Sequence, residues 1–129
     1  MFRPINPAAV RPPFGRYRHG LLAPAGAEIL VTSGQLGIAP DETVPDDVSL
    51  QAELCFRAIG AILAEAGMDF SNVIRLNAFV TRRADVPAYM AVRDRFVGDP
   101  PPVSTLVIVS GFSRPEFRVE VEATAARLP

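Results

Sequence analysis

Residues 47–80 read D-V-S-L-Q-A-E-L-C-F-R-A-I-G-A-I-L-A-E-A-G-M-D-F-S-N-V-I-R-L-N-A-F-V, which joins a long helical pattern to a strand pattern. Asp47 or Ser49 would cap the start of the helix, and Gly67 would end it. Its apolar residues recur at intervals of three and four, which predicts an amphipathic helix; they are Ala52, Cys55, Phe56, Ile59, Ile62, Leu63 and Ala66. Val73–Val80 then alternates between apolar and polar residues, which predicts a strand with one buried face.

A second helix and two further strands follow this stretch. Asp85 is a suitable N-cap, Pro87 lies in the first turn, where proline is tolerated, and Gly98 would end the helix. One side of this helix carries Tyr89, Met90, Arg93, Phe96 and Val97. Two apolar runs rich in β-branched residues then predict strands at Ser104–Val109 and Phe117–Ala126.

The residues before the long helix predict a pair of strands. Prolines recur in the first sixteen residues and favour an extended arm there, because each removes a backbone donor and restricts φ. Glu28–Ser33 is rich in β-branched residues and predicts a strand. Pro24 and Gly26 would form a hairpin turn in front of it, so that a strand beginning at Tyr17 pairs with it antiparallel.

These elements run in the order β-β-α-β-α-β-β, and neither a repeat nor a linker interrupts residues 1–129. We therefore predict a single α+β domain, with a mixed sheet that carries two helices on one face. Two helices leave the other face of the sheet uncovered. We expect apolar side chains among the polar ones on that face, namely Leu30, Leu76, Phe79, Leu106 and Ile108. Self-association would cover them.

The composition excludes several classes of function. The chain has a formal net charge of −1, and all its basic residues are arginines. The weak negative charge disfavours nucleic-acid binding, and without lysine no side chain forms a Schiff base with a substrate or with pyridoxal phosphate. Cys55 and His19 are the only residues of their kinds, too few for a disulfide or a zinc site. No apolar run reaches the roughly 20 residues of a membrane helix. We therefore predict a cytoplasmic protein without metal, cofactor, nucleic-acid or membrane partner.

Several short motifs, in this order and spacing, resemble the reactive intermediate deaminase family, also called the RidA or YjgF family. They cover nearly the whole chain: Gly15-Arg16-Tyr17-Arg18-His19-Gly20, Thr32-Ser33-Gly34-Gln35, Gln51, Ala64-Glu65-Ala66-Gly67, Pro101-Pro102-Val103-Ser104 and Val119-Glu120-Val121-Glu122-Ala123. The resemblance implies a chorismate-mutase-like fold that assembles as a homotrimer, with clefts for a small molecule between subunits. It also implies hydrolysis of enamines and imines, such as 2-aminoacrylate, to a keto acid and ammonia without a cofactor.

The resemblance assigns roles to individual residues. Tyr17 matches a tyrosine that lines the cleft, and Gly34 matches a glycine whose backbone closes on the ligand. Glu120 matches a glutamate that positions water or moves a proton, which makes it the candidate catalytic residue. Ser104 has no His-Asp set to activate it as a nucleophile, so we expect it to hydrogen-bond the ligand or the backbone.

Two positions depart from the family pattern. Val103 stands where an arginine of the family forks onto the substrate carboxylate, and Met90 stands where many members have asparagine. An aliphatic side chain makes none of the charge-assisted hydrogen bonds of a guanidinium. We therefore expect a changed substrate choice, with a ligand less acidic than 2-aminoacrylate and with Val103 and Met90 in the binding site.

Other interpretations of these residues stay open. Glu120 could lie on a solvated strand face, and Tyr17 on the rim of a cleft. His19 could be a general base or a surface residue. Arg93 could bring an anion contact to the cleft from the second helix, or pair with a neighbouring acid such as Asp94.

The sequence as a whole predicts a homotrimer that hydrolyses a small enamine, imine or related carbonyl metabolite by water-mediated proton transfer. The alternative is a non-catalytic trimer that binds or senses a metabolite. Ribonuclease activity, which has been attached to some family members, is disfavoured by the acidic pI and the absent lysine.

Overall fold

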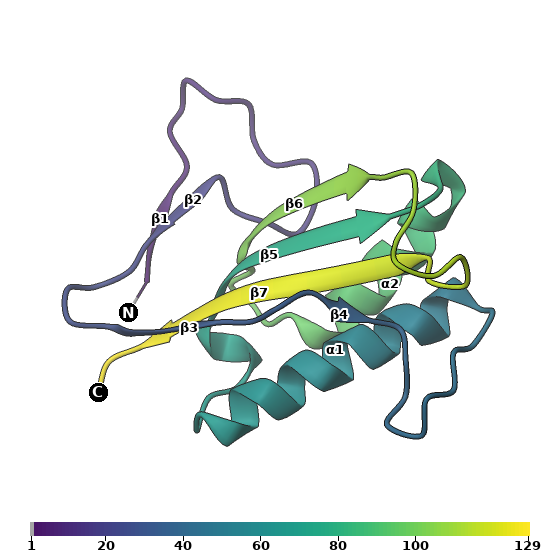
Figure 1. Cartoon of the computed structure of the whole chain (residues 1–129). Coiled ribbons are helices and arrows are strands. Elements are labelled where there is room, and N and C mark those ends of the chain that lie inside the picture. Colours follow the sequence, from purple (N-terminus) through teal and green to yellow (C-terminus); the bar gives the residue numbers. More distant parts are fainter. Residues whose placement is uncertain (1) are drawn as a thin grey trace.

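The computed structural model of the chain describes residues 2–129, and its longest helix is α1 (Val48–Glu65) (Figure 1). Asp47 is the N-cap, because its carboxylate accepts hydrogen bonds from the backbone N–H groups of Ser49 (2.7 Å) and Leu50 (3.2 Å). Gly67 follows the helix with φ +71°, a conformation that glycine adopts at little cost. The predicted helix and both of its ends are confirmed.

The main sheet has five strands: β3 (Glu28–Val31), β4 (Gln35–Leu36), β5 (Val73–Val80), β6 (Val103–Ile108) and β7 (Val119–Arg127). Their order is β3-β7-β5-β6. β4 also pairs with β7, at Glu120 and Val121, whereas β3 pairs with residues 124–127 of the same strand. β5 and β6 are parallel, whereas β7 is antiparallel to β5, β3 and β4. α1 and α2 (Val86–Phe96) both lie on one face of this sheet (Figure 1). The predicted α+β class, with a mixed sheet and two helices on one face, is confirmed.

The predicted hairpin between the first strands is wrong. β2 (Gly20–Leu22) pairs with β1 (Arg3–Ile5) in a separate two-stranded sheet, whereas β3 pairs with β7. The turn at Pro24 and Gly26 exists, but it connects the two sheets instead of two paired strands. Strand pairing depends on distant partners: β7, with nine residues, is long enough to accept both β3 and the short β4, which the sequence did not indicate.

The second helix begins at the predicted place, but Asp85 does not cap it with its side chain. The carboxylate of Asp85 instead accepts hydrogen bonds from Arg118 (2.8 and 3.3 Å) and Arg82 (3.1 and 3.4 Å). Two guanidinium groups hold the carboxylate more strongly than the neutral backbone N–H groups at the helix start. The helix ends at Phe96, and Gly98 is not in the left-handed conformation of an end signal.

Strand register shows which side chains face the helices. Leu76, Ala78 and Val80 are buried in the core between sheet and helices, and their partners on β6 share that face. Of the five residues expected on the open face, only Phe79 lies there. Leu76 belongs to the hydrophobic core, and Leu30 and Leu106 pack against that core. Ile108 pairs with the buried Val80 and therefore lies on the helix-covered face as well. Side chains alternate along a strand, so a face is assigned only once the register is known.

Cys55 lies on the buried face of α1 and is fully shielded from solvent. Burial, together with the negative charge of Glu120, raises the pKa of its thiol to about 12. Since only the thiolate is nucleophilic, we expect alkylation by iodoacetamide at pH 8 to be slowed on the order of a thousandfold relative to a free thiol. Intact mass measured over time would check this, with the urea-denatured chain as control. Equal rates in the two states would contradict it.

Candidate functional site

A cavity of about 350 Å³ lies at the β6 edge of the main sheet. Three segments line it: a loop between β1 and β2, one side of α2, and the edge strand β6. The lining residues are Phe14, Gly15 and Tyr17 from the loop, Val86, Met90 and Arg93 from α2, and Ser104, Thr105 and Leu106 from β6. Figure 1 shows the loop between β1 and β2 passing beside β6.

Backbone and side-chain hydrogen bonds hold the loop over this edge. Arg16 donates to the carbonyl oxygens of Asp94 (3.4 Å) and Gly98 (3.3 Å) at the end of α2. The backbone N–H of Arg18 donates to the carbonyl of Pro102, just before β6 (3.2 Å). The Tyr17 ring, placed between these two anchors, packs edge-on against Phe14 with ring centres 5.9 Å apart. The loop therefore forms a wall of the cavity.

Three of the residues predicted for the binding site line this one cavity: Tyr17, Met90 and Ser104. Arg93 also lines it, one turn along α2 from Met90, and it pairs with Asp94 at the same time. The pairing of Arg93 with a neighbouring acid is thus confirmed, and its place in the cavity wall leaves the anion contact a prediction.

The remaining lining residues were not predicted. Phe14 and Gly15 directly precede Tyr17, and Thr105 and Leu106 directly follow Ser104, so their proximity in sequence was an available signal. Val86 lies one helical turn before Met90, which is the same kind of signal.

Gly34 and Glu120 form a second group, outside this cavity. A Cβ atom at Gly34 would lie 2.6 Å from Cδ of Glu120, so only glycine allows the backbone to approach the carboxylate this closely. Glu120 pairs with Phe79 on β5 and with Leu36 on β4, which places its side chain on the open face of the sheet. Gly34, predicted to close on the ligand, and Glu120, predicted to move a proton, are therefore neighbours.

Val103 is not among the residues that line the cavity. It pairs with Arg75 on β5, and both side chains lie on the open face, on the opposite side of β6 from Ser104. Arg75 donates hydrogen bonds to Asn77 (3.1 Å) and Thr105 (3.4 Å) on the same face. The surroundings of position 103 thus contain a guanidinium group from the neighbouring strand.

Within one chain the two groups of site residues do not meet. Glu120 pairs with Phe79, and Phe79 pairs with Val107 on β6, so one whole strand separates Glu120 from the cavity edge. With neighbouring strands about 4.8 Å apart, the backbone of Glu120 lies about 10 Å from β6. A ligand in the cavity of one chain is therefore out of direct contact with that chain's own Glu120.

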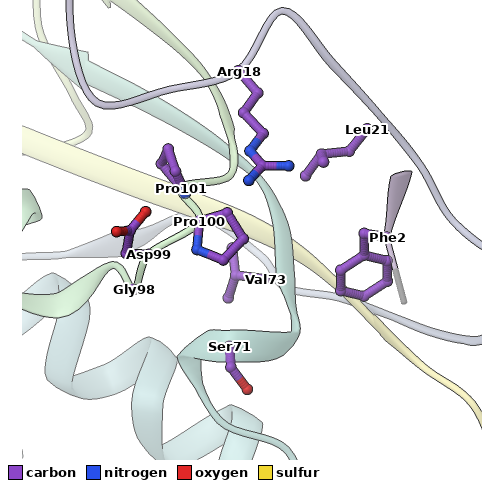
Figure 2. Close-up of a pocket in the computed structure, with 9 residues that line it drawn as sticks. All are labelled: Phe2, Arg18, Leu21, Ser71, Val73, Gly98, Asp99, Pro100 and Pro101. Atoms are coloured by element: carbon purple, nitrogen blue, oxygen red, sulfur yellow. The ribbon is translucent and has the colours of Figure 1, made fainter. Parts of the chain in front are cut away.

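His19 and a second cavity lie beside the site. His19 donates a short hydrogen bond from Nε2 to the carbonyl oxygen of Arg11 (2.6 Å), so this ring nitrogen is occupied by the loop. The second cavity, of about 270 Å³, lies between the small sheet and the start of β6, and Figure 2 shows the Arg18 side chain extending into it. None of the predicted site residues lines this cavity.

Residues 2–129 contain neither a candidate metal site nor a candidate membrane span. No three His, Cys, Asp or Glu side chains in this part of the chain come close enough together to hold a metal ion. In the same residues, no helix has the length and the apolar character that crossing a membrane requires.

Comparison with known proteins supplies relatives for this arrangement. The family model described as Endoribonuclease L-PSP matches residues 8–127. Protein DfrA of Myxococcus xanthus is 34% identical over 113 residues, which cover 86% of this chain and 85% of DfrA. TdcF of Escherichia coli, whose name places it among reactive intermediate deaminases, is 28% identical over 103 residues, covering 77% of this chain and 79% of TdcF.

Solved structures agree with the sequence relatives. The crystal structure of YyfB from Yersinia pestis, a Rid-family protein of unknown function, superposes with a TM-score of 0.84 at 26% identity and covers 98% of both chains. The structure of E. coli TdcF with bound serine superposes with a TM-score of 0.72 at 26% identity, over 84% of this chain and 91% of TdcF. Since the family model spans most of its residues and its fold is that of Rid proteins, this chain belongs to the RidA/YjgF family.

Proposed function

We propose that copies of this chain assemble as a cytoplasmic homotrimer in which Glu120 of one copy faces the cavity of the next, and that this joint site hydrolyses a small imine or enamine. The separation of Glu120 from the cavity within one chain carries the proposal, because a second copy is needed to bring a proton-transferring carboxylate to a bound ligand. The name of TdcF supports imine chemistry, and the serine in its structure supports a substrate of amino-acid size.

The open face of the sheet supports assembly. Ile29, Val31 and Val107 are 55%, 69% and 44% exposed, and strand register places them on the same face as Glu120. Ile29 and Val31 lie on β3 at one edge of the sheet and Val107 on β6 at the other, so exposed apolar side chains occur at both edges of the face that carries Glu120, and covering them favours contact with another protein. A copy of the same chain, arranged with closed symmetry, would cover this face and complete the site in one step.

The chemistry needs one carboxyl group and one water molecule. An enamine takes a proton at carbon from the acid form of Glu120 and becomes an iminium ion. Water then adds to the C=N carbon while the carboxylate of Glu120 accepts a proton from it. Glu120 passes this proton to nitrogen, the C–N bond breaks and ammonia leaves, and the proton of the new hydroxyl group returns to the Glu120 carboxylate, so that a carbonyl group remains. Tyr17 and Ser104 have hydroxyl groups in the cavity wall that would orient the substrate.

An imine-hydrolysis assay tests the proposal. An amino-acid oxidase generates 2-imino acids from a panel of amino acids, semicarbazide traps imine that persists, and the release of ammonia is followed. We expect the protein to accelerate release for at least one member, and light scattering to give a trimer. A monomer at assay concentration would contradict the proposal, as would ligand binding without acceleration, which is the result expected of a metabolite-binding trimer. Salt-sensitive RNA binding without acceleration would favour a ribonuclease instead.

An arginine at position 103 should raise activity on 2-aminoacrylate. We expect Val103→Arg to raise kcat/KM for 2-aminoacrylate by about tenfold or more, because a guanidinium fork to a carboxylate contributes about 2 kcal/mol or more in a buried site. Val103→Met is the matched control, because it places a long side chain without charge at the same position. Equal gains in the two variants, or a wild-type rate already as high, would show that a guanidinium group at position 103 does not select the substrate.

A further inference from the structure

Among residues 2–129, Arg93 is the only charged residue in the wall of the β6 cavity. Its side chain is 4% exposed, whereas that of its partner Asp94 is 37% exposed. Arginine is rarely buried to this degree unless acidic or polar groups satisfy it, because removing a charge from water is costly. The burial of Arg93 therefore calls for partners.

The hydrogen bonds of Arg93 leave part of its guanidinium free. Nε and Nη2 both donate to one oxygen of Asp94, at 3.2 and 3.0 Å. Within residues 2–129, Nη1 donates no hydrogen bond, although a guanidinium has five N–H donors. Asp94 is the neighbouring residue and uses a single oxygen, so it does not satisfy the group. The unused donors therefore leave the guanidinium able to bind an additional acceptor.

The rest of the cavity wall favours an anion as that acceptor. Among the described residues no acidic side chain lines the cavity, and the other polar side chains of its wall are the hydroxyl-bearing Tyr17, Ser104 and Thr105. A guanidinium with unused donors, set among hydroxyl donors and apolar side chains, matches a small carboxylate.

The position of Arg93 also constrains the shape of the ligand. Arg93 comes from α2, on the helix side of β6, whereas position 103 points to the open face. The open face also carries Glu120, which under the proposed function acts from another copy. A ligand held at Arg93 must therefore extend around the β6 edge before its reacting carbon meets that carboxylate.

Building on the proposed function, we propose that Arg93 binds the carboxylate of the substrate and that this carboxylate is separated by several atoms from the C=N carbon. Such a substrate is the imine or enamine of an oxo acid with a distant carboxylate, as distinct from one whose only carboxylate is attached to the reacting carbon. The carboxylate is then a weaker acid than one directly attached to the reacting carbon, in line with the ligand expected from Val103.

Binding of stable oxo acids to the intact oligomer tests the inference without requiring turnover. Isothermal titration would compare pyruvate, 4-oxopentanoate, 5-oxohexanoate and the neutral pentan-2-one. We expect 4-oxopentanoate or 5-oxohexanoate to bind at least about tenfold more tightly than both pyruvate and pentan-2-one. Equal affinities for acid and neutral ketone, or a preference for pyruvate, would overturn the inference even if no variant were made.

Variants then assign the effect to one side chain. Arg93→Met, which keeps a similar length without charge, should lose the preference for the distant acid while binding pentan-2-one as before. Arg95→Met is the matched control, because Arg95 lies on the same helix, is 59% exposed and pairs with Glu53 outside the cavity. Equal losses in the two variants would overturn the assignment, because they would indicate a general effect of charge.

The two proposals fail in different ways. Acid binding that depends on Arg93, without acceleration of imine hydrolysis, would refute the proposed catalysis and leave the anion site standing. Imine hydrolysis that is unaffected by Arg93→Met, with no acid preference, would refute the anion site and leave the catalysis standing.

Discussion

Replacing Glu120 with glutamine is expected to lower kcat for imine hydrolysis by about 10²- to 10⁴-fold, the usual contribution of a positioned general acid or base. Glutamine keeps the size of the side chain, so the close packing against Gly34 should persist while the ability to carry a proton is lost. Ligand affinity should change little, because in this proposal Glu120 moves protons and does not hold the ligand. The imine assay and titration calorimetry on the same preparation would measure both quantities.

Glu122→Gln is the matched control for this experiment. Glu122 lies on the same strand and the same open face, two residues away, and accepts a hydrogen bond from Asn77 (3.1 Å). We expect this variant to keep most of its activity. Full activity in Glu120→Gln would remove Glu120 from the mechanism, and equal losses in both variants would point to a general disturbance of the open face.

Replacing Asp85 with asparagine is expected to lower the free energy of unfolding by about 3 kcal/mol, the cost typical of breaking a buried ion pair from one side. Asp85 is 4% exposed and receives hydrogen bonds from Arg118 and Arg82, so the variant leaves the Arg118 guanidinium without its charged partner. Urea denaturation of both proteins at pH 7 would measure the difference.

The same substitution should change how stability depends on pH. Burial by itself raises the pKa of Asp85, but the hydrogen bonds from Arg118 and Arg82 outweigh it, so the pKa is lowered in the folded state. The stabilisation by Asp85 is therefore complete above the unfolded pKa of about 3.9 and is lost as the pH falls through the lower folded pKa. The gap between wild type and Asp85→Asn should be constant from about pH 5 to 7 and shrink below about pH 4.

Glu53→Gln provides the comparison at the surface. Glu53 also pairs with two arginines, Arg57 and Arg95, each at 2.9 Å, but both partners are well exposed. Solvent screens such pairs, so we expect a much smaller loss of stability. A loss equal to that of Asp85→Asn would show that burial is not what makes the Asp85 network strong.

Local signals explain which elements could be predicted from the sequence. α1 has two candidate caps within three residues, of which Asp47 is the N-cap, a continuous apolar face and a left-handed Gly67, and the strand at Val73–Val80 has its predicted bounds. In each case the signal lies within the element itself. β2 pairs with β1 across 15 to 19 residues, and Arg118 donates its hydrogen bonds to Asp85 across 33 residues. No local sequence pattern indicates either interaction.

The sequence by itself determined the family and the class of fold and named the candidate site residues, because the order of short motifs and the hydrophobic periodicity lie along the chain. Only the tertiary structure decided how those residues are grouped. It set Tyr17, Met90, Arg93 and Ser104 around one cavity and left Glu120 beside Gly34, one strand away. The physical reason is that strand register and the path of the β1–β2 loop come from long-range hydrogen bonds and packing, which assign each side chain to a face only when the chain has folded.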